Sequence, residues 1–284
     1  MIRKAVIPLA GLGTRLRPLT FAVPKAMLPL VDAADRVRPV VDYIVTEAVL
    51  AGIRQVALIV SPGQTELIQK YLASVASTGE RAVPDRIEYI LQPTPQGFGD
   101  AVAQGEEFVG GEPFLLLLGD HVYLADRGAP PCAAQVVRAF AECGGAAMVG
   151  MQPVRAEELP KVGTAGGEPI GKRVYRCRDF IEKPSPAEAR KRLLTRGLPR
   201  GRFLAHCGIY CFSAEIFDCL AELVRTGRRT KDEIQLADAQ SLLLSRHKED
   251  YYLYRIAGRA YDTGTPEGYT KAFTAFLRSR ERVS

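Results

Sequence analysis

The chain has 284 residues, of which 38 are lysine or arginine and 32 are aspartate or glutamate, so its formal net charge is +6. Apolar residues make up 47% of the chain and charged residues 25%, which is the usual composition of a globular protein. This composition excludes a disordered chain, a collagen-like fibre and a small disulfide-rich protein. The length allows a sizeable core without covalent cross-links.

The first half of the chain alternates short apolar runs with amphipathic stretches. The apolar runs predict strands at residues 4–10, 55–60, 87–91, 114–118 and 146–151. Helical spacing predicts helices at 40–51, from Ser61-Pro62 to about 72, at 100–108 and at 133–142. Continuous apolar strands separated by helices predict an α/β fold with a mainly parallel sheet that helices cover on both faces.

The second half of the chain has a different pattern. Longer antiparallel strands are predicted at 174–182 and 203–212, with a helix at 186–195 between them. Helices at 213–224, 232–247 and 266–278 and a strand at 251–257 complete the chain. Because no linker or repeat divides the sequence, we predict a single domain, 1–284, with one continuous mixed sheet and a smaller second lobe.

Positive charge is concentrated in one segment. Eleven basic and three acidic residues lie between Gly171 and Leu204, which favours an anionic partner such as nucleic acid, a phosphorylated small molecule or a membrane surface. A solvated arginine-rich helix face, including Arg190–Arg192, is the alternative. The aromatic residues of the segment form no recognised RNA-binding signature, so we expect no nucleic-acid partner.

The cysteines and the apolar runs indicate the compartment. The six cysteines form no Cys-x-x-Cys pair and have no histidine at zinc-finger spacing, so free thiols in a reducing compartment are expected. The longest aliphatic run, 115–118, is too short to span a membrane, and the N-terminal apolar run is interrupted too early for a signal peptide. We therefore expect a cytoplasmic protein without a membrane partner.

A glycine-rich loop follows the first predicted strand and reads Leu9-Ala10-Gly11-Leu12-Gly13-Thr14-Arg15. Glycines after a buried strand let backbone N–H groups approach a phosphate chain closely. The third glycine of the dinucleotide fingerprint is replaced by Leu16, and no Walker lysine follows. Arg15 and Lys25 supply two cations, which suit a triphosphate better than a nicotinamide dinucleotide. A plain tight turn is the alternative for the glycines alone.

Two aspartates are candidates for a metal site. Asp120 follows a buried strand, and Asp262 lies in a Gly/Thr-rich turn far along the chain. Carboxylate oxygens in such positions suit Mg²⁺, which binds through few protein ligands together with phosphates and water. A helix cap for Asp120 and an Asx turn for Asp262 are the alternatives. The histidines are weak signals: His121 adjoins Asp120, but packing or solvent exposure explains it equally well.

Other residues have the chemistry to bind the rest of a nucleotide sugar. Lys183, in Glu182-Lys183-Pro184, can hold a phosphate, and Glu182 can accept hydrogen bonds from sugar hydroxyls; a surface ion pair is the alternative. Gln92 can pair with the edge of a base, with Gly97 leaving room beside it, although a Pro/Gly turn also explains that loop. Gly163 and Gly208 would let sugar oxygens approach the backbone; a turn or close packing is the alternative for each.

These motifs, taken in order, resemble those of sugar-1-phosphate nucleotidyltransferases, most of all the bacterial UTP–glucose-1-phosphate uridylyltransferases. The resemblance extends through nearly the whole chain. It rests on the loop at 9–20 with Lys25-Ala26-Met27-Leu28-Pro29, and on the segments 92–101, 119–120, 182–184, 232–238 and 262–265. It implies a Rossmann-like nucleotidyltransferase fold and Mg²⁺-dependent in-line transfer from UTP to α-D-glucose 1-phosphate, which yields UDP-glucose and pyrophosphate.

The resemblance also implies a role for each candidate residue. Catalytic roles fall to Arg15, Lys25, Asp120 and Lys183. Nucleotide binding falls to Leu9, Ala10, Gly11, Gly13, Thr14, Arg15, Lys25, Gln92, Gly97 and Asp120. Sugar-phosphate binding falls to Gly163, Glu182, Lys183 and Gly208, and metal binding to Asp120 and Asp262. Residues 1–152 would form the nucleotide half, and 153–284 the half for the sugar phosphate and subunit contacts; a homodimer or homotetramer is expected.

Three departures from the family pattern bear on specificity. Ala26 stands where many uridylyltransferases have glutamate, the stretch from Leu72 to Ile87 is short, and the segment 31–40 is long. Loss of a polar group near the base or ribose leaves dTTP as an alternative to UTP, so a glucose-1-phosphate thymidylyltransferase, or an enzyme for another sugar phosphate, remains open. A non-catalytic nucleotide-binding regulatory module is the remote alternative, against which the retained acids and lysines speak.

Overall fold

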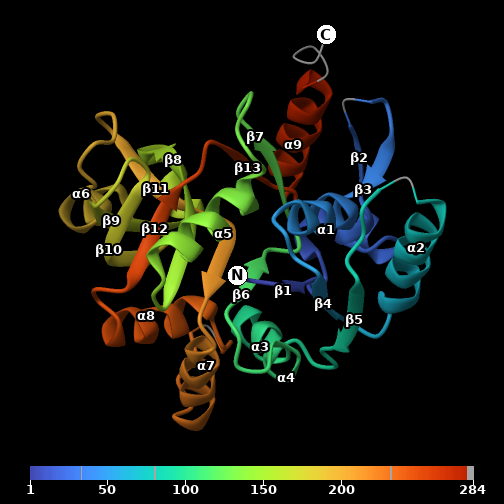
Figure 1. Ribbon diagram of the computed structural model, residues 1–284, viewed down its shortest axis with the longest axis horizontal. Coiled ribbons are helices and arrows are strands. Elements are labelled where there is room, and N and C mark those ends of the chain that lie inside the picture. Colours follow the sequence, from blue (N-terminus) through green and yellow to red (C-terminus); the bar gives the residue numbers. More distant parts are fainter. Residues whose placement is uncertain (33, 80, 231, 280–284) are drawn as a thin grey trace.

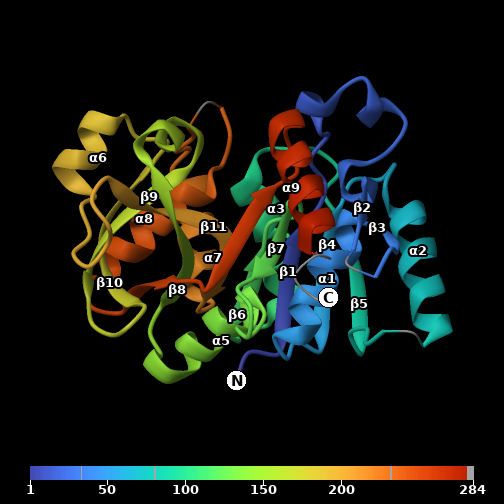
Figure 2. The same ribbon diagram turned by 90° about the horizontal axis from the view of Figure 1, so that it is seen from above.

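The computed structural model describes residues 1–32, 34–79, 81–230 and 232–279. A nine-stranded mixed sheet runs through these residues in the order β5-β4-β1-β6-β11-β8-β12-β10-β9 (Figure 1). Figure 2 shows β5 and α2 at one end of the molecule and β9, β10 and α6 at the other. The predicted continuous mixed sheet is therefore confirmed.

The parallel part of the sheet comes from the first half of the chain. It contains β1 (Lys4–Pro8), β4 (Gln55–Val60), β5 (Arg86–Leu91) and β6 (Phe114–Leu117). β1 pairs in parallel with β4 and β6, and β4 pairs in parallel with β5. Apart from β5, these strands are buried almost throughout, because helices cover both faces. Their carboxyl ends meet at one edge of the sheet, which is where ligands bind in such folds.

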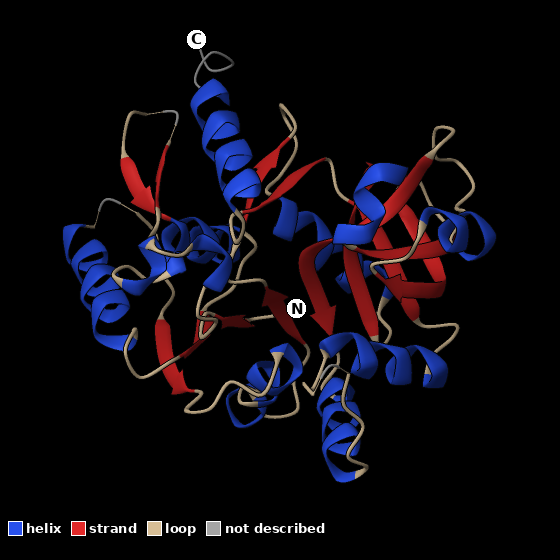
Figure 3. Cartoon of the chain, turned by 180° about the vertical axis from the view of Figure 1, so that it is seen from behind, coloured by secondary structure: helices blue, strands red, loops and turns tan. Residues whose placement is uncertain are grey.

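The second part of the sheet closes on itself. Its strands are β8 (Ala147–Arg155), β9 (Gly163–Pro169), β10 (Val174–Glu182), β11 (Arg202–Phe212) and β12 (Tyr251–Arg255). Each pairs with the next in the order β11-β8-β12-β10-β9, and β9 pairs back onto β11. These strands form a small barrel-like lobe, seen beside the parallel part in Figure 3. Among the described residues of this lobe, β8 and β12 alone pair in parallel, so parallel pairing predominates in the first part and not here.

Helices cover both faces of the sheet, as predicted. One core cluster packs alternate strand residues such as Ile7 and Leu58 against α1 (Val40–Leu50), α2 (Thr65–Thr78), α5 (Cys132–Cys143) and α9 (Pro266–Ser279). The intervening residues, such as Val6 and Ile59, face α3 (Phe98–Ala103), α4 (Glu106–Val109), α7 (Glu215–Arg225) and α8 (Leu236–Arg246). A third, smaller cluster lies under α6 (Pro186–Arg192).

Several predicted helix boundaries were wrong. The helix predicted at 100–108 is two helices that meet at Gly105, where a Cβ would lie 2.9 Å from a methyl group of Val6. The last predicted turn of α6 is missing, and α2 continues to Thr78. The helix predicted at 232–247 begins only at Leu236, because the residues before it bond to another loop instead.

Among the residues that the structure describes, five strands were not predicted. They are β2 (Pro29–Val31), β3 (Val37–Pro39), β7 (His121–Ala125), β9, and β13 (Gly258–Asp262). β2 and β3 form a hairpin, and β7 pairs antiparallel with β13. The β7–β13 ladder matters for function because it joins two distant parts of the chain.

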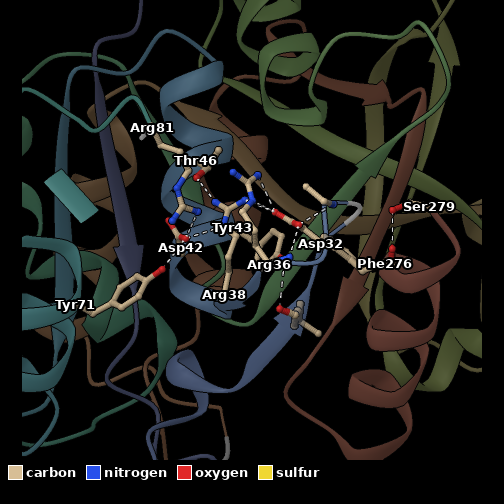
Figure 4. Close-up of polar contacts among 12 residues, drawn as sticks. Asp32, Arg36, Arg38, Asp42, Tyr43, Thr46, Tyr71, Arg81, Phe276 and Ser279 are labelled. Atoms are coloured by element: carbon tan, nitrogen blue, oxygen red, sulfur yellow. Dashed lines mark hydrogen bonds and ion pairs between the residues drawn. The ribbon is translucent and has the colours of Figure 1, made fainter. Parts of the chain in front are cut away.

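The described end of the long segment, residues 34–39, is anchored to the helix that follows it. In Figure 4, Asp42 on α1 accepts hydrogen bonds from Arg38 Nε at 2.7 Å, Arg81 Nη1 at 2.5 Å and Tyr71 OH at 2.8 Å. Asp42 and Arg38 are both buried, and the guanidinium of Arg38 stacks 4.5 Å from the ring of Tyr43. The hairpin is therefore fixed to α1 by a buried ion pair.

The cysteines are all unpaired, as predicted, and all of them except Cys143 are buried. In the part of the chain that the structure describes, no helix combines the length and the apolar character that crossing a membrane requires.

Candidate active site

The glycine-rich loop connects β1 to Lys25. Leu9 is buried and its backbone N–H donates to the carbonyl of Ile59 at 2.7 Å, which continues the strand pairing. Gly13 has a φ of 62°, in the left-handed region that glycine adopts readily, and its carbonyl accepts from Thr20 Oγ1 at 2.8 Å. A Cβ on Gly11 would lie 3.3 Å from Lys25 Nζ. The loop and Lys25 therefore lie together, as predicted.

Lys25 and Asp120 form a close ion pair at the ends of β1 and β6. Lys25 Nζ lies 2.7 Å from Asp120 Oδ2, and the two side chains are only 15% and 13% exposed. Burial acts to raise the pKa of Asp120. The charge of Lys25 and a hydrogen bond from His121 outweigh it and hold that pKa well below its usual range. Asp120 is therefore a carboxylate near neutral pH.

Asp262 reaches the same place through the β7–β13 ladder. In that ladder Asp262 pairs directly with His121, the residue after Asp120. The backbone N–H and the hydroxyl of Thr263 both donate to the carbonyl of Asp120, at 2.7 and 2.8 Å. Ligand atoms of Asp120, His121 and Asp262 all lie within 4.8 Å of one another. We call Lys25, Asp120, His121 and Asp262 the carboxylate cluster.

A glycine packs closely against both carboxylates of the carboxylate cluster. A Cβ on Gly264 would lie 2.8 Å from Asp120 Oδ2 and 3.0 Å from Asp262 Oδ1. The backbone N–H of Gly264 also donates to Asp262 Oδ1 at 2.7 Å, which orients that carboxylate. Two oriented carboxylates beside a side-chain-free position fit a divalent cation, whose preferred ligands are oxygens. The two residues therefore have the placement that a divalent cation requires, and their role as metal ligands stays a prediction.

His121 belongs to this cluster, although its sequence signal is weak. His121 Nδ1 lies 3.0 Å from Asp120 Oδ1. Burial acts to lower the pKa of His121, but the hydrogen bond with Asp120 and the charges of Asp120 and Asp262 raise it overall. In the sequence, its position next to Asp120 was the one indication that His121 belongs to the site. The pairing with Asp262, which brings the imidazole to both carboxylates, is visible only in the structure.

Gly208 packs against the ring of His121. It has a φ of 78° and lies where the pairing of β11 with β8 is irregular, between His206 and Tyr210. A Cβ at this position would lie 3.0 Å from His121 Cδ2. Gly208 is therefore required by close packing at the site, whatever its part in sugar binding.

The loop with Gln92 and Gly97 is held by the segment before α8. Gln92 is buried, and its Nε2 donates to Asp100 Oδ2 at 2.5 Å. Gly97 has a φ of 118°, and a Cβ there would lie 2.6 Å from the carbonyl oxygen of Ile234. The N–H of Ile234 donates to Gln96 O at 2.9 Å, and its carbonyl accepts from Gly99 N at 2.8 Å. Contact with Ile234 thus requires glycine at position 97, a reason the sequence analysis missed.

The remaining candidates gather at the ends of β9 and β10, in a group that we call the sugar corner (Gly163, Glu182, Lys183 and His206). Glu182 pairs with Gly163, whose added Cβ would lie 2.8 Å from Glu182 Oε2 and 3.4 Å from His206 Nδ1. Lys183 has a φ of 52°, and its Nζ lies 3.5 Å from Glu182 Oε1 with both side chains about half exposed. His206 stands two residues before Gly208 on β11, so this strand contacts both the sugar corner and the carboxylate cluster.

The other cations are placed as the solvated alternative predicted. Arg190, Lys191 and Arg192 on α6 are exposed. Within the basic segment, Arg176 and Arg178 pair with acidic side chains, Glu249 at 3.1 Å and Glu168 at 2.5 Å respectively. Arg15 is exposed, and no ion pair is recorded for it with any residue that the structure describes.

Known proteins resemble this chain along its whole length. Residues 4–279 match the family described as nucleotidyl transferase. The UTP–glucose-1-phosphate uridylyltransferase of Mycoplasma genitalium is 34% identical, over 96% of this chain and 92% of its own. That of Streptococcus pneumoniae is 31% identical, over 99% and 92%.

Solved structures share the fold. A UDP-glucose pyrophosphorylase complexed with UDP-glucose superposes with a TM-score of 0.80 at 29% identity, over 98% of this chain and 100% of its own. The UTP-bound enzyme of Acinetobacter baumannii has a TM-score of 0.76 at 26% identity, over 100% and 98%. The predicted Rossmann-like fold is thus confirmed. The chain is an enzyme that belongs to the nucleotidyl transferase family.

Proposed function

We propose that the protein transfers the uridylyl group of UTP to α-D-glucose 1-phosphate, which yields UDP-glucose and pyrophosphate. The observation that carries this proposal is the carboxylate cluster beside the glycine-rich loop, where one ammonium and two carboxylates lie at the carboxyl ends of β1 and β6. The similarity to uridylyltransferases over nearly the full length supports UTP and glucose 1-phosphate as the substrates.

The nucleotide half of the site would bind the triphosphate. The backbone of Leu9, Ala10, Gly11, Gly13 and Thr14 would follow the phosphates, because the glycines leave the N–H groups accessible. Lys25, fixed by Asp120, would neutralise charge at the α-phosphate, and the exposed Arg15 would bind the departing pyrophosphate.

The base and the sugar phosphate would lie on either side of this centre. Gln92 and Gly97, in the loop held by Ile234, would face the base. Lys183 would hold the phosphate of glucose 1-phosphate, and Glu182 would accept hydrogen bonds from sugar hydroxyls. Gly163 and Gly208 would leave room for the sugar. On this proposal residues 1–152 bind the nucleotide and 153–284 the sugar phosphate, with Asp262 as the contribution of the second half to the centre.

The reaction then needs no covalent intermediate. An oxygen of the sugar phosphate forms a bond to the α-phosphorus while the bond from that phosphorus to the bridging oxygen of the β-phosphate breaks. The attacking phosphate is already an anion, so no base must remove a proton from it. The protein's contribution is to align two substrates that repel each other and to neutralise their charge.

Asp120 and Asp262 would hold Mg²⁺, and any side chain at Gly264 would press against both carboxylates. When bound, a divalent cation neutralises charge on phosphate oxygens and fixes their orientation. The chain itself orients both carboxylates, through His121 at Asp120 and through the N–H of Gly264 at Asp262. Removal of divalent cations with EDTA is expected to abolish turnover, and restoring Mg²⁺ to recover it.

A thymidylyltransferase is the second candidate, and Ala26 is the observation that favours it. Ala26 is buried beside Lys25, where many uridylyltransferases have glutamate, so a polar group near the nucleotide is missing. The difference concerns the base or ribose and leaves the phosphate chemistry unchanged.

Pyrophosphate release from a panel of nucleotides and sugar phosphates tests the proposal. UTP with glucose 1-phosphate should give the highest kcat/KM among UTP, dTTP, CTP and ATP, each paired with glucose, galactose and mannose 1-phosphates. A preference for dTTP would overturn the uridylyl assignment, and no release with any pair would favour a non-catalytic module. A homodimer or homotetramer and a cytoplasmic location stay predictions; light scattering during gel filtration tests the first.

A further inference from the structure

We infer that His121 is a third ligand of the cation, beside Asp120 and Asp262, and that the site therefore prefers a divalent transition-metal ion such as Mn²⁺ to Mg²⁺. The inference rests on the metal site of the proposed function. It goes beyond that function in assigning the imidazole and the metal preference, neither of which the two-carboxylate site implies.

The register of the β7–β13 ladder places His121 beside Asp262. His121 and Asp262 are directly opposite each other in this antiparallel pair. Side chains of directly paired residues lie on the same face of a ladder, with Cβ atoms about 5 Å apart. The imidazole of His121 and the carboxylate of Asp262 therefore share one face, which is the face that Asp120 adjoins.

The ligand atoms of the three residues also lie close together. One atom each from Asp120, His121 and Asp262 lies within 4.8 Å of the other two. An ion that binds ligands at about 2.1 Å holds adjacent ligands about 3 Å apart and opposite ligands about 4 Å apart, so the three side chains must move closer together to contact one ion, and their present separation makes that movement small.

The ring of His121 is held toward the carboxylates. Nδ1 of His121 faces Asp120 Oδ1 at 3.0 Å, and Gly208 lies against the carbon edge of the ring, where any side chain would displace it. The side chain of His121 is only 17% exposed, so the imidazole cannot rotate freely into solvent. The orientation is thus built into the fold before any ion binds.

The chemical consequence is a change in metal preference. Mg²⁺ prefers oxygen ligands in a regular octahedron and keeps several waters, so an imidazole adds little to its binding. Nitrogen ligands favour first-row transition metals, and their contribution increases the affinity for such ions more than that for Mg²⁺. A site of two carboxylates and one imidazole should therefore discriminate against Mg²⁺ more than a site of two carboxylates does.

Mn²⁺ is the probe that tests this inference without measuring turnover. Binding of Mn²⁺ to the full-length protein, with and without UTP, is followed by loss of the free-ion EPR signal, and competition with Mg²⁺ gives the ratio of the two affinities. Pulsed EPR then reports whether a nitrogen nucleus is bound directly to the Mn²⁺. The variants are His121→Asn, which keeps a hydrogen-bond donor near Asp120 but removes the imidazole, and the matched control His247→Asn, whose histidine pairs with Glu215 elsewhere in the molecule.

The expected result is a directly bound nitrogen in the wild-type protein and in His247→Asn, absent in His121→Asn. The preference for Mn²⁺ over Mg²⁺ should fall by about tenfold or more in His121→Asn and stay unchanged in the control. A wild-type protein without a bound nitrogen, or an unchanged affinity ratio in His121→Asn, would overturn the inference and leave His121 as a residue that only positions Asp120. Thermal melts of both variants confirm that they are folded.

An Asp120→Asn variant separates failure of this inference from failure of the proposed function. If Mn²⁺ binds, Asp120→Asn weakens its binding and no nitrogen is detected, the proposed metal site stands and the inference about His121 is wrong. If the wild-type protein does not bind Mn²⁺ even with UTP, the inference and the proposed metal site are both wrong.

Discussion

The carboxylate cluster and the sugar corner differ in how firmly the fold holds them. Lys25 and Asp120 are 2.7 Å apart with little exposure, whereas Lys183 and Glu182 are 3.5 Å apart and about half exposed. Buried, oriented charges cost no reorganisation when a reaction begins, while an exposed lysine is hydrated and screened by salt. The comparison teaches that the proposed centre for phosphate chemistry is preformed, whereas on the same proposal the sugar corner becomes ordered when its substrate binds.

The backbone explains this difference. The carboxylate cluster joins distant parts of the chain through the bonds of Thr263 to Asp120 and through the β7–β13 ladder. Lys183 instead comes directly after the last residue of β10. It has a positive φ and is followed by a proline, so the strand pairing does not extend to it. Substitutions should therefore have larger effects in the carboxylate cluster than in the sugar corner.

The largest effect is expected for Asp120→Asn, which keeps the shape of the side chain but removes its charge. Loss of one preorganised charge should lower kcat by about 10²–10³-fold, as measured by pyrophosphate release at saturating substrates. Asp218→Asn, at an exposed position of α7, is the control and should leave kcat unchanged. Near-normal turnover of Asp120→Asn would remove the carboxylate cluster from the mechanism.

The second prediction concerns Glu47 on α1, a helix that packs against β7, the strand of His121. Glu47 on α1 is buried and accepts a hydrogen bond from Ala133 N, in the first turn of α5, at 2.7 Å. Both helices pack against β7. Burial raises the pKa of Glu47 to about 7, although the N–H groups of Ala133 and Cys132 lower it. The folded protein therefore holds a proton between about pH 4.5 and 7 that the unfolded chain releases, so the contribution of Glu47 to stability falls as the pH rises.

The Glu47→Gln variant removes this ionisation and keeps an acceptor for Ala133. Urea unfolding should show similar stabilities for variant and wild type near pH 4. At pH 8 the variant should be the more stable, by up to about 3 kcal/mol. Burial lowers the pKa of His206 to about 4, so the contribution of His206 to stability rises between about pH 4 and 6.5, opposite to that of Glu47. Because both proteins contain His206, the difference in stability between variant and wild type isolates the effect of Glu47. A difference that does not change with pH would contradict the burial of Glu47.

The third prediction tests the loop that is proposed to face the base. Gly97→Ala places a Cβ 2.6 Å from Ile234 O at a φ of 118°, so strain and overpacking together should cost about 2–3 kcal/mol. The free energy of unfolding should fall by this amount, or the KM for UTP should rise as the loop moves away from Ile234. Gly63→Ala is the control, because no atom lies within 4 Å of the added Cβ. Equal behaviour of the two variants would show that Ile234 does not hold the loop.

The smallest catalytic effect is expected for Lys183→Met in the sugar corner. Loss of one charged hydrogen bond to the sugar phosphate should lower kcat/KM for glucose 1-phosphate by about 10–100-fold, mainly through KM. Because the side chain is exposed, the free energy of unfolding should change by no more than about 0.5 kcal/mol. Lys191→Met, on the exposed face of α6, should change neither quantity. A fall in kcat as large as that of Asp120→Asn would remove the distinction between the two regions.

The sequence predicted those parts of the fold that depend on local patterns. Strands such as β4 and β6 are continuous apolar runs, and their burial on both faces follows directly from that composition. The five missed strands are short or rich in glycine and form only because a distant strand pairs with them. β9, for example, needs Gly166 and Gly167 because added Cβ atoms would lie 2.7 Å from Leu193 Cα and from Arg176 O.

The candidate site shows the same division. Lys25 and Asp120 were predicted to act together, and the structure places them in contact. The role of Ile234 in holding Gly97, and the pairing of His121 with Asp262, could not be predicted, since both depend on contacts between segments more than a hundred residues apart. Residue types thus indicated which groups could carry the chemistry, and only the tertiary pairing showed which of them meet.

The Mg²⁺ dependence of UTP affinity tests the central claim most directly, namely that the carboxylate cluster acts on the nucleotide and the sugar corner does not. Calorimetric titration of UTP, with Mg²⁺ or with EDTA, is carried out on the wild-type protein, Asp120→Asn and Lys183→Met. We predict that Mg²⁺ strengthens UTP binding in the wild type and in Lys183→Met but not in Asp120→Asn. Mg²⁺-dependent binding that survives in Asp120→Asn and is lost in Lys183→Met would contradict the account.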